Sequence, residues 1–250
     1  MAAKKPMTRT DMVAWEKEMA AEAEAAAHSE QTVGGGFVST RNGRLSWGGA
    51  VVPGNAIRVV ILDYCRENTY YQGRYDPDAP QSPVCYALAR EEGDMAPHEN
   101  AAVPQSEACA GCPQNEFGSA DTGRGKACKN TRRLALVAED SVEDPSAEVV
   151  FLKVPVTSVK AWSGYVQAIA DAKRRPPHGV VTEISLVPDA KTQFQMVFKL
   201  VDSITDASVG MNIRSLREAL GDGRLMFPYA THEEESVANT KPLKTSRKRG

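Results

Sequence analysis

The sequence predicts a mainly β protein with flanking helices (α+β), and three stretches carry that prediction. Residues 56–64 form the most apolar and β-branched run of the chain, as expected of a central strand. In residues 193–200 large apolar side chains alternate with polar ones, the period of a strand with one buried face. From Thr157 or Ser158 to Lys173, apolar residues recur at helical spacing. Strand signals on both sides of one amphipathic helix favour the α+β class.

The chain of 250 residues is long enough for one sizeable domain with tails. Residues 1–33 are rich in Ala, Glu, Lys and Met and predict an N-terminal helical arm, capped by Thr10. Residues 34–228 hold the strand signals and predict the core domain. Residues 229–250 are mostly polar and end in a basic run, which predicts a disordered C-terminal tail.

The other elements of the core follow in order. Asn42-Gly43 predicts a hairpin turn between two strands, because this dipeptide accepts the positive φ angles of a tight turn. Pro176 and Pro177 must end the amphipathic helix, and Gly221 is expected to stop a second, shorter helix. The expected strands are 35–40, 43–47, 56–64, 84–88, 134–137, 148–154, 180–187 and 193–200, and the shorter helix is 212–220.

The order of these elements predicts an architecture. Three or four strands, a helix and a closing hairpin follow one another as in an OB-type five-stranded barrel, here with a loop inserted between early strands. An α+β sandwich with a zinc ribbon on one edge has the same strand count and is the alternative.

The inserted loop, at about residues 85–133, predicts a structural zinc site. Cys109 and Cys112 have the Cys-x-x-Cys spacing that directs two sulfurs to one ion, and Cys128 and Cys85 lie on either side of them. The glycine-rich segment 117–126 contains few apolar residues, so a metal is a reason for it to be ordered. His98 is the alternative fourth ligand in place of Cys85.

Other roles for the cysteines are less consistent with the sequence. A disulfide requires an oxidising compartment, and the N-terminus lacks the apolar segment of a secretory signal. A redox pair opens a helix after a strand, whereas Cys112 precedes Pro113 and a glycine-rich loop. Four unrelated cytosolic thiols are the remaining alternative. Cys65 ends an apolar run and is expected to be a core residue.

Charge is unevenly distributed although the net charge is only −2. Basic residues gather at 124–133, 173–175 and 241–249, and acidic residues at 139–148 and 233–235. Binders of single-stranded nucleic acid combine cations along the backbone with aromatic rings on which bases stack. Tyr64 fits a core position equally well, and Trp162 is expected to be core. The candidate contact residues are Arg58, Tyr64, Tyr70, Tyr71, Arg74, Tyr75, Phe117, Arg124, Lys126, Lys129, Arg132 and Arg133.

A longer motif surrounds the cysteines: Pro-Val-Cys85, then Cys109-x-x-Cys112-Pro-x-Asn-x-Phe-Gly-Ser, then Gly-x-Gly-Lys-Ala-Cys128-Lys-x-x-Arg-Arg-Leu134. The motif resembles a group of tailed-phage proteins taken to be single-stranded DNA-binding proteins, over about residues 50–205. These are similar in plan to the zinc-containing helix-destabilising protein of T-even phages, an OB-fold with a zinc subdomain.

The resemblance implies binding of single-stranded DNA in phage replication or recombination, in the host cytoplasm, with replication or recombination proteins as partners. It implies Zn²⁺ at Cys85, Cys109, Cys112 and Cys128. The T-even protein uses three cysteines and one histidine, which keeps His98 as an alternative. That protein also ends in an acidic tail, whereas the last nine residues here are basic.

Other classes of protein are less consistent with the sequence. We expect no enzyme, because the sulfur-rich metal site is closed and the four histidines are scattered in loops and tails. Gly34-Gly35-Gly36 lacks the Lys-Ser/Thr of a phosphate-binding loop. No apolar run reaches the length of a membrane span, which predicts a cytoplasmic protein. A zinc-ribbon adaptor or transcription regulator acting through protein contacts is the alternative function.

Overall fold

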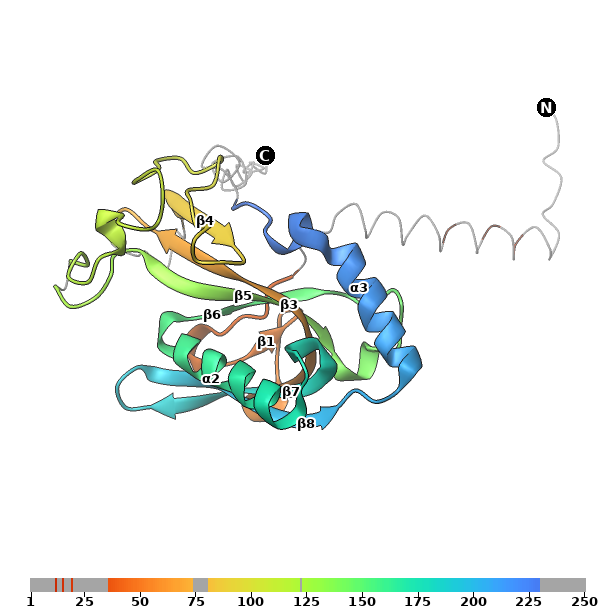
Figure 1. The fold of residues 1–250 in the computed structure, drawn as a ribbon. Helices are drawn as coiled ribbons and strands as arrows, with labels where there is room; N and C mark the ends of the chain where they lie inside the picture. Colours follow the sequence, from red (N-terminus) through yellow and green to blue (C-terminus); the bar gives the residue numbers. More distant parts are fainter. Residues whose placement is uncertain are drawn as a thin grey trace, which may run out of the picture. The chain divides into compact units, whose positions relative to one another are not determined.

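The longest of the described strands, β3 (Ala56–Tyr70), lies at the centre of an antiparallel sheet (Figure 1). The computed structural model describes residues 12, 15, 19, 36–73, 81–121 and 123–229. One edge of β3 pairs with β5 (Lys129–Ala138). The other edge is divided between β7 (Val180–Asp189), which pairs with residues 56–60, and β4 (Cys85–Ala89), which pairs with residues 66–70.

Two outer strands complete the sheet. β6 (Val150–Val154) pairs with β5, and β8 (Gln193–Ser203) pairs with β7, which gives the order β6-β5-β3-β7-β8. The turn predicted at Asn42-Gly43 is confirmed, because both residues have positive φ. The strands predicted on either side of it are reduced to one antiparallel bridge, in which the backbones of Ser39 and Ser46 exchange two hydrogen bonds of 2.9 Å. A two-stranded sheet of β1 (Ser46–Trp47) and β2 (Ala50–Val51) follows this turn.

The described strands form an open sheet, and the closed five-stranded barrel is not found among them. Helix α2 (Val156–Lys173) follows β6 directly and packs against β8, β5 and β6. Ser158 Oγ accepts a hydrogen bond of 2.9 Å from the backbone N–H of Met196 in β8. The helix therefore provides a hydrogen-bond acceptor for one backbone N–H of β8, a strand that would pair with another strand in a closed barrel. The coarser prediction, a mainly β protein with flanking helices, is confirmed.

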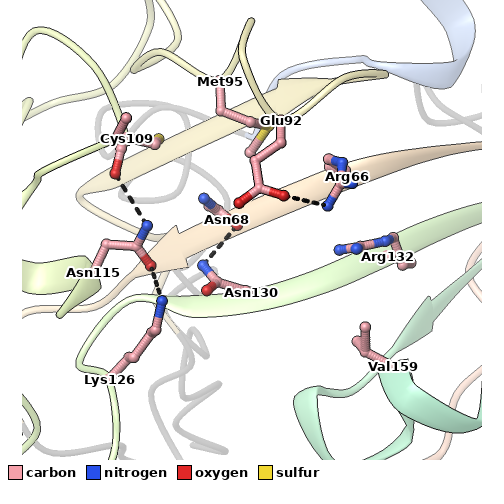
Figure 2. A pocket seen from close by; sticks show the side chains of 11 residues that line it. Arg66, Asn68, Glu92, Met95, Cys109, Asn115, Lys126, Asn130, Arg132 and Val159 are labelled. Atoms are coloured by element: carbon pink, nitrogen blue, oxygen red, sulfur yellow. Dashed lines mark hydrogen bonds and ion pairs between the residues drawn. The ribbon is translucent and has the colours of Figure 1, made fainter. Parts of the chain in front are cut away.

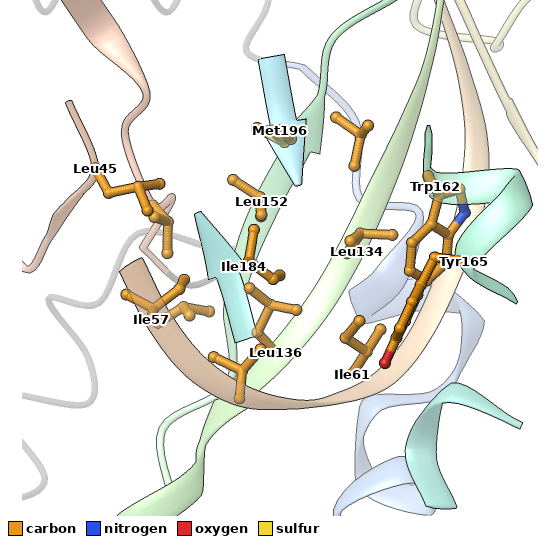
Figure 3. Packing of buried hydrophobic residues seen from close by; sticks show 14 of the residues in the cluster. Leu45, Ile57, Ile61, Leu134, Leu136, Leu152, Trp162, Tyr165, Ile184 and Met196 are labelled. Carbon is orange, nitrogen blue, oxygen red and sulfur yellow. The ribbon is translucent and has the colours of Figure 1, made fainter. Parts of the chain in front are cut away.

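Each face of the sheet has its own core. Apolar residues of β3, β5, β6, β7 and β8 pack with Trp162, Tyr165 and Ile169 of α2 on one face (Figure 3). The other face packs against α3 (Ala207–Leu225) through Ile213 and Leu216. Trp162 is 2% exposed, so the prediction that it is a core residue is confirmed.

Helix α2 ends where the sequence predicts, whereas α3 begins before the predicted residue 212 and continues beyond the predicted stop at Gly221. Arg174 after α2 adopts the left-handed conformation (φ 51°) ahead of the two prolines. Asp206 caps α3 by accepting hydrogen bonds from the backbone N–H groups of Ser208 and Val209. Gly221 interrupts α3 with φ 51° and ψ 179°. Neither described helix has the length and apolar content needed to cross a membrane.

A bulge in β3 sets which side chains share a face. The pairing with β5 shifts between Ile61 and Asp63. Beyond the bulge, Tyr64 packs with the α2-side core and Cys65 with the α3-side core. Because side chains alternate along a strand, Arg66 and Asn68 follow Tyr64 on the α2 side, and Glu67 follows Cys65.

Some predictions fall on residues that the structure leaves undescribed. Met12, Trp15 and Met19 are helical, and the rest of the predicted arm at 1–33 lies outside the described residues. Arg74 and Tyr75 also lie outside them, as does the predicted tail from residue 230 onward.

Candidate nucleic-acid interface and cysteine cavity

The end of β3 brings distant cysteines together. Tyr70 pairs with Cys85 at the start of β4, and Thr69 pairs with Lys129 at the start of β5, so Cys128 lies close to the same strand end. The turn that carries the other two cysteines is held to this position, since the backbone N–H of Cys128 donates to Gln114 O at 2.8 Å. As a result, Cys85, Cys109, Cys112 and Cys128 all line one small cavity of about 20 Å³.

The four sulfurs are free thiols in a confined environment. Burial raises the pKa of Cys85 and of Cys109, and burial together with the neighbouring sulfurs raises the pKa of Cys128 to about 12. Burial is the larger effect, and the Gln105 backbone for Cys85 and the Asn68 side chain for Cys109 offset part of the rise in pKa. A bound dication would favour the thiolates.

In the described parts of the chain, however, no group of three or more His, Cys, Asp or Glu side chains is placed so that it could hold a metal ion as it stands. The four cysteine thiols and the cavity that they share fit zinc, but the described side chains do not form a complete set of metal ligands. Zinc binding by the four cysteines is therefore a proposal.

The alternative ligand His98 lies elsewhere. It does not line the cysteine cavity, and its ring stacks on Tyr86 with centroids 4.9 Å apart. The backbone N–H of Asn100 donates to His98 Nδ1 at 3.1 Å, and the Tyr86 hydroxyl lies 3.1 Å from the same nitrogen. Cys85 is therefore the better candidate for a fourth ligand. Cys65 is 1% exposed among apolar side chains, which confirms the prediction of a core residue.

Beside this cavity, an open cleft of about 210 Å³ lies between the α2-side face of the sheet and the cysteine loop (Figure 2). Its floor consists of two cross-strand pairs from β3 and β5, Arg66 with Arg132 and Asn68 with Asn130. Lys126 of the cysteine loop adds a third cation to the lining. The cleft thus combines three cations with amide groups at one surface.

Positive charge in the cleft exceeds the negative charge that faces it. Glu92 is the acidic side chain of the lining, and its carboxylate lies 3.4 Å from Arg66. The Glu92 side chain is 85% exposed, so water screens this ion pair. Burial and then the neighbouring charge of Arg66 lower the pKa of Arg132. Two guanidinium groups held side by side are suited to an anion such as a phosphate.

The structure separates the predicted contact residues into groups. Arg132 and Lys126 line the cleft. Phe117 is 82% exposed, and Lys126 Nζ lies 5.2 Å from the centre of its ring. Arg124 and Lys129 are exposed on the same loop and strand end. Phe117 thus lies beside a lining residue of the cleft, whereas Arg124 and Lys129 are not among its lining residues.

Other predicted contacts lie away from the cleft. Tyr70 lines the cysteine cavity, and Tyr71 follows it with 42% exposure. Tyr64 packs edge to face on Trp162, with ring centres 5.2 Å apart, so its core role is the correct one. Arg58 is exposed near the opposite end of β3, where it forms ion pairs with Glu183 and Glu139.

The prediction that Arg133 contacts nucleic acid is wrong. Adjacent residues of a strand point to opposite faces, so Arg132 enters the cleft and Arg133 enters the α3-side interior. Its side chain is 1% exposed and forms an ion pair with Glu67, whose side chain is fully buried. A guanidinium in this position cannot reach a phosphate of bound DNA.

Residues that the sequence analysis missed lie on the strands that line the cleft. Arg66, Asn68 and Asn130 were not among the candidates, although the polar run from Arg66 to Asn68 directly follows the apolar part of the strand. The change from apolar to polar residues within this strand could have identified Arg66 and Asn68 as candidates.

Comparison with models of known families, with curated proteins and with solved structures finds no match for this chain.

Proposed function

We propose that this protein binds single-stranded DNA without strong sequence preference. The observation that carries the proposal is the cleft in which Arg66, Arg132 and Lys126 lie together beside the amides of Asn68 and Asn130. Cations of this kind contact phosphates, which all sequences share. The exposed Phe117 ring beside Lys126 supplies a surface on which a base can stack.

The order of the elements supports the proposal. Strands β3, β5 and β6 precede α2, and the β7–β8 hairpin follows it, with β4 and the cysteine loop inserted after the first strand. We propose that this is an OB-type fold in which α2 packs against β8 where strand pairing would close the barrel. Oligonucleotides bind OB-folds on the second and third strands and on the loop after the first strand, and the cleft combines β5 with that loop.

Zn²⁺ is the proposed structural cofactor, held by Cys85, Cys109, Cys112 and Cys128. When bound, it would fix the loop that carries Lys126 and Phe117 against β3 and β5. A role in phage replication or recombination, with proteins of those processes as partners in the host cytoplasm, is proposed from the resemblance of the cysteine motif.

Replacing Arg132 with Ala is expected to weaken binding of poly(dT) about 10- to 150-fold at low salt, because a charge-assisted hydrogen bond contributes about 1.5 to 3 kcal/mol. The slope of log affinity against log salt should become shallower by about 0.7 for each lost phosphate contact. Fluorescence titration at several salt concentrations measures both quantities. Poly(dA) should show the same loss.

Arg58→Ala is the matched control, since Arg58 lies on the same strand as Arg66 but is already paired with two carboxylates. Its affinity and salt slope should equal those of the wild type. A loss confined to one homopolymer would indicate a sequence-specific reader. A wild-type protein that does not bind poly(dT) at low salt would favour the zinc-ribbon adaptor, for which Phe117 offers an exposed apolar contact.

A further inference from the structure

One carboxylate faces the cations of the cleft. Of the described residues that line the cleft, Glu92 alone carries a negative charge, whereas Arg66, Arg132 and Lys126 carry positive charges. Glu92 Oε2 lies 3.4 Å from Arg66 Nη1, and Figure 2 shows this ion pair beside Arg132. The carboxylate therefore lies where the proposed function places a phosphate of bound DNA.

The backbone that carries Glu92 is held in place on both sides. Arg90 donates to the two carboxylate oxygens of Asp63 at 2.9 and 2.8 Å and to Asp222 of α3 at 2.6 Å. The backbone N–H of Met95, whose side chain is 4% exposed, donates to Glu92 O at 3.3 Å. The side chain of Glu92, in contrast, is 85% exposed. Rotation about its own χ angles can therefore move the carboxylate into water while the turn stays in place.

A carboxylate and a phosphate compete for the same guanidinium group, because both accept charge-assisted hydrogen bonds from it. The chain tethers Glu92 beside Arg66, which gives its carboxylate a high effective concentration there. A phosphate that binds Arg66 must first displace this carboxylate. Glu92 also has a role without DNA, since Arg66 and Arg132 are directly opposite like charges on paired strands and its negative charge offsets their repulsion.

We infer that Glu92 is an internal competitor of DNA for Arg66, which lowers the affinity of the cleft and speeds the release of a bound strand. The inference rests on the proposed function, since it concerns the same cleft. Release is faster because the carboxylate can take the place of a phosphate that leaves Arg66. Changes at one interface alter the dissociation rate more than the association rate, so the effect should lie mainly in dissociation.

The test compares Glu92→Gln with the wild type in fluorescence titrations of the full-length protein with oligo(dT) at several salt concentrations. Glutamine keeps an oxygen that can accept a hydrogen bond from Arg66 but removes the charge. We expect the affinity at low salt to rise roughly two- to fivefold, the factor that corresponds to a solvent-exposed ion pair. The gain should shrink as salt is added, because salt screens this pair. Stopped-flow measurements should show dissociation slowed by a similar factor.

Two controls separate competition for Arg66 from the loss of any negative charge. Glu91, one residue earlier, is exposed and does not line the cleft, so Glu91→Gln should bind oligo(dT) as the wild type does. In an Arg66→Ala background, Glu92→Gln should have little further effect, because the cation for which the two anions compete is absent.

The outcomes for the inference and for the proposed function are distinct. Wild-type or weaker binding by Glu92→Gln would mean that Glu92 only positions Arg66, and would overturn the inference. An equal gain from Glu91→Gln, or a gain that persists undiminished without Arg66, would also overturn it. In these cases the wild type still binds oligo(dT) and the proposed function stands. A wild type that fails to bind oligo(dT) would overturn the proposed function, and the inference with it.

Discussion

Replacing Arg133 with Met is expected to lower the free energy of unfolding by about 3 kcal/mol, the lower end of the cost of breaking a buried ion pair, because Lys153 then remains as the one cation beside the buried carboxylate of Glu67. Arg133 Nε donates to Glu67 Oε1 at 3.1 Å, and both side chains are at most 1% exposed. Urea unfolding followed by circular dichroism measures the loss. Methionine fills much of the arginine stem's volume, so the missing charge rather than a cavity dominates the effect.

The surroundings of the pair explain the size of this effect. Lys153 Nζ lies 3.3 Å from Glu67 Oε2, and the Tyr229 hydroxyl donates to Glu67 Oε1 at 2.8 Å. Arg133 also donates to Phe227 O at 2.8 Å, and its guanidinium lies 4.3 Å from the centre of the Phe227 ring. The ion pair therefore holds the chain segment after α3 against the sheet.

Two controls separate charge from packing. Arg132→Ala, one residue away but facing the cleft, should change the unfolding free energy by no more than about 0.5 kcal/mol. The double variant Glu67→Gln/Arg133→Met should lose less than the sum of the two single variants, since it leaves no buried charge unpaired and the remaining Lys153 is partly exposed to water. An Arg133→Met protein as stable as the wild type would contradict the buried ion pair.

The same carboxylate makes stability depend on pH in one direction. Burial raises the pKa of Glu67, but the charges of Lys153 and Arg133 and the hydrogen bonds of Arg133 and Tyr229 outweigh burial, so the pKa lies below its ordinary value of 4.5. The unfolded state then takes up a proton before the folded state does. The stability contributed by Glu67 is complete above pH 4.5 and is lost as the pH falls through the lower folded-state pKa. Urea unfolding across this range should show the deficit of Glu67→Gln shrinking as the pH falls.

One tightly bound Zn²⁺ per chain is expected, and its removal should unfold the cysteine loop while leaving the sheet folded. The loop contributes little to the two large cores: its small apolar cluster consists of Ala87, Ala89 and Met95, with Cys109 packed against it. Structural zinc binding contributes apparent free energies of about 10 to 16 kcal/mol in zinc-finger peptides, far more than this cluster can supply. Metal analysis gives the stoichiometry, and hydrogen exchange maps the protection lost on chelation.

The cysteines themselves provide the matched variants for this experiment. Cys128→Ser should lose zinc and the protection of the loop at 95–128. Cys65→Ser removes a thiol on the same strand as Asn68 but in the α3-side core, and should keep the metal. Absence of stoichiometric zinc from protein purified without chelators would contradict the proposed site, as would a Cys109→Ala/Cys112→Ala variant with an unchanged loop.

Local patterns were sufficient to predict most of the elements. The apolar run of β3, the alternation in β8 and the proline-terminated helix α2 each depend on side chains within a few residues of one another. The turn at Asn42-Gly43 likewise needs only the positive φ angles of two adjacent residues. The cysteine spacing predicted a common site, and the structure does bring the four sulfurs to one cavity.

Only the tertiary structure decided which face each polar residue occupies. The bulge after Ile61 and the pairing of β3 with β5 place Arg66 beside Arg132, and Glu67 beside Arg133 in the interior. Both effects depend on contacts between residues more than 60 positions apart, which a pattern of neighbouring residues does not encode. The open form of the sheet also depends on contacts between residues that are far apart in the sequence. Whether β6 and β8 pair or α2 packs against β8 is set by how three separate elements fit together, and here Ser158 of α2 binds the backbone of Met196.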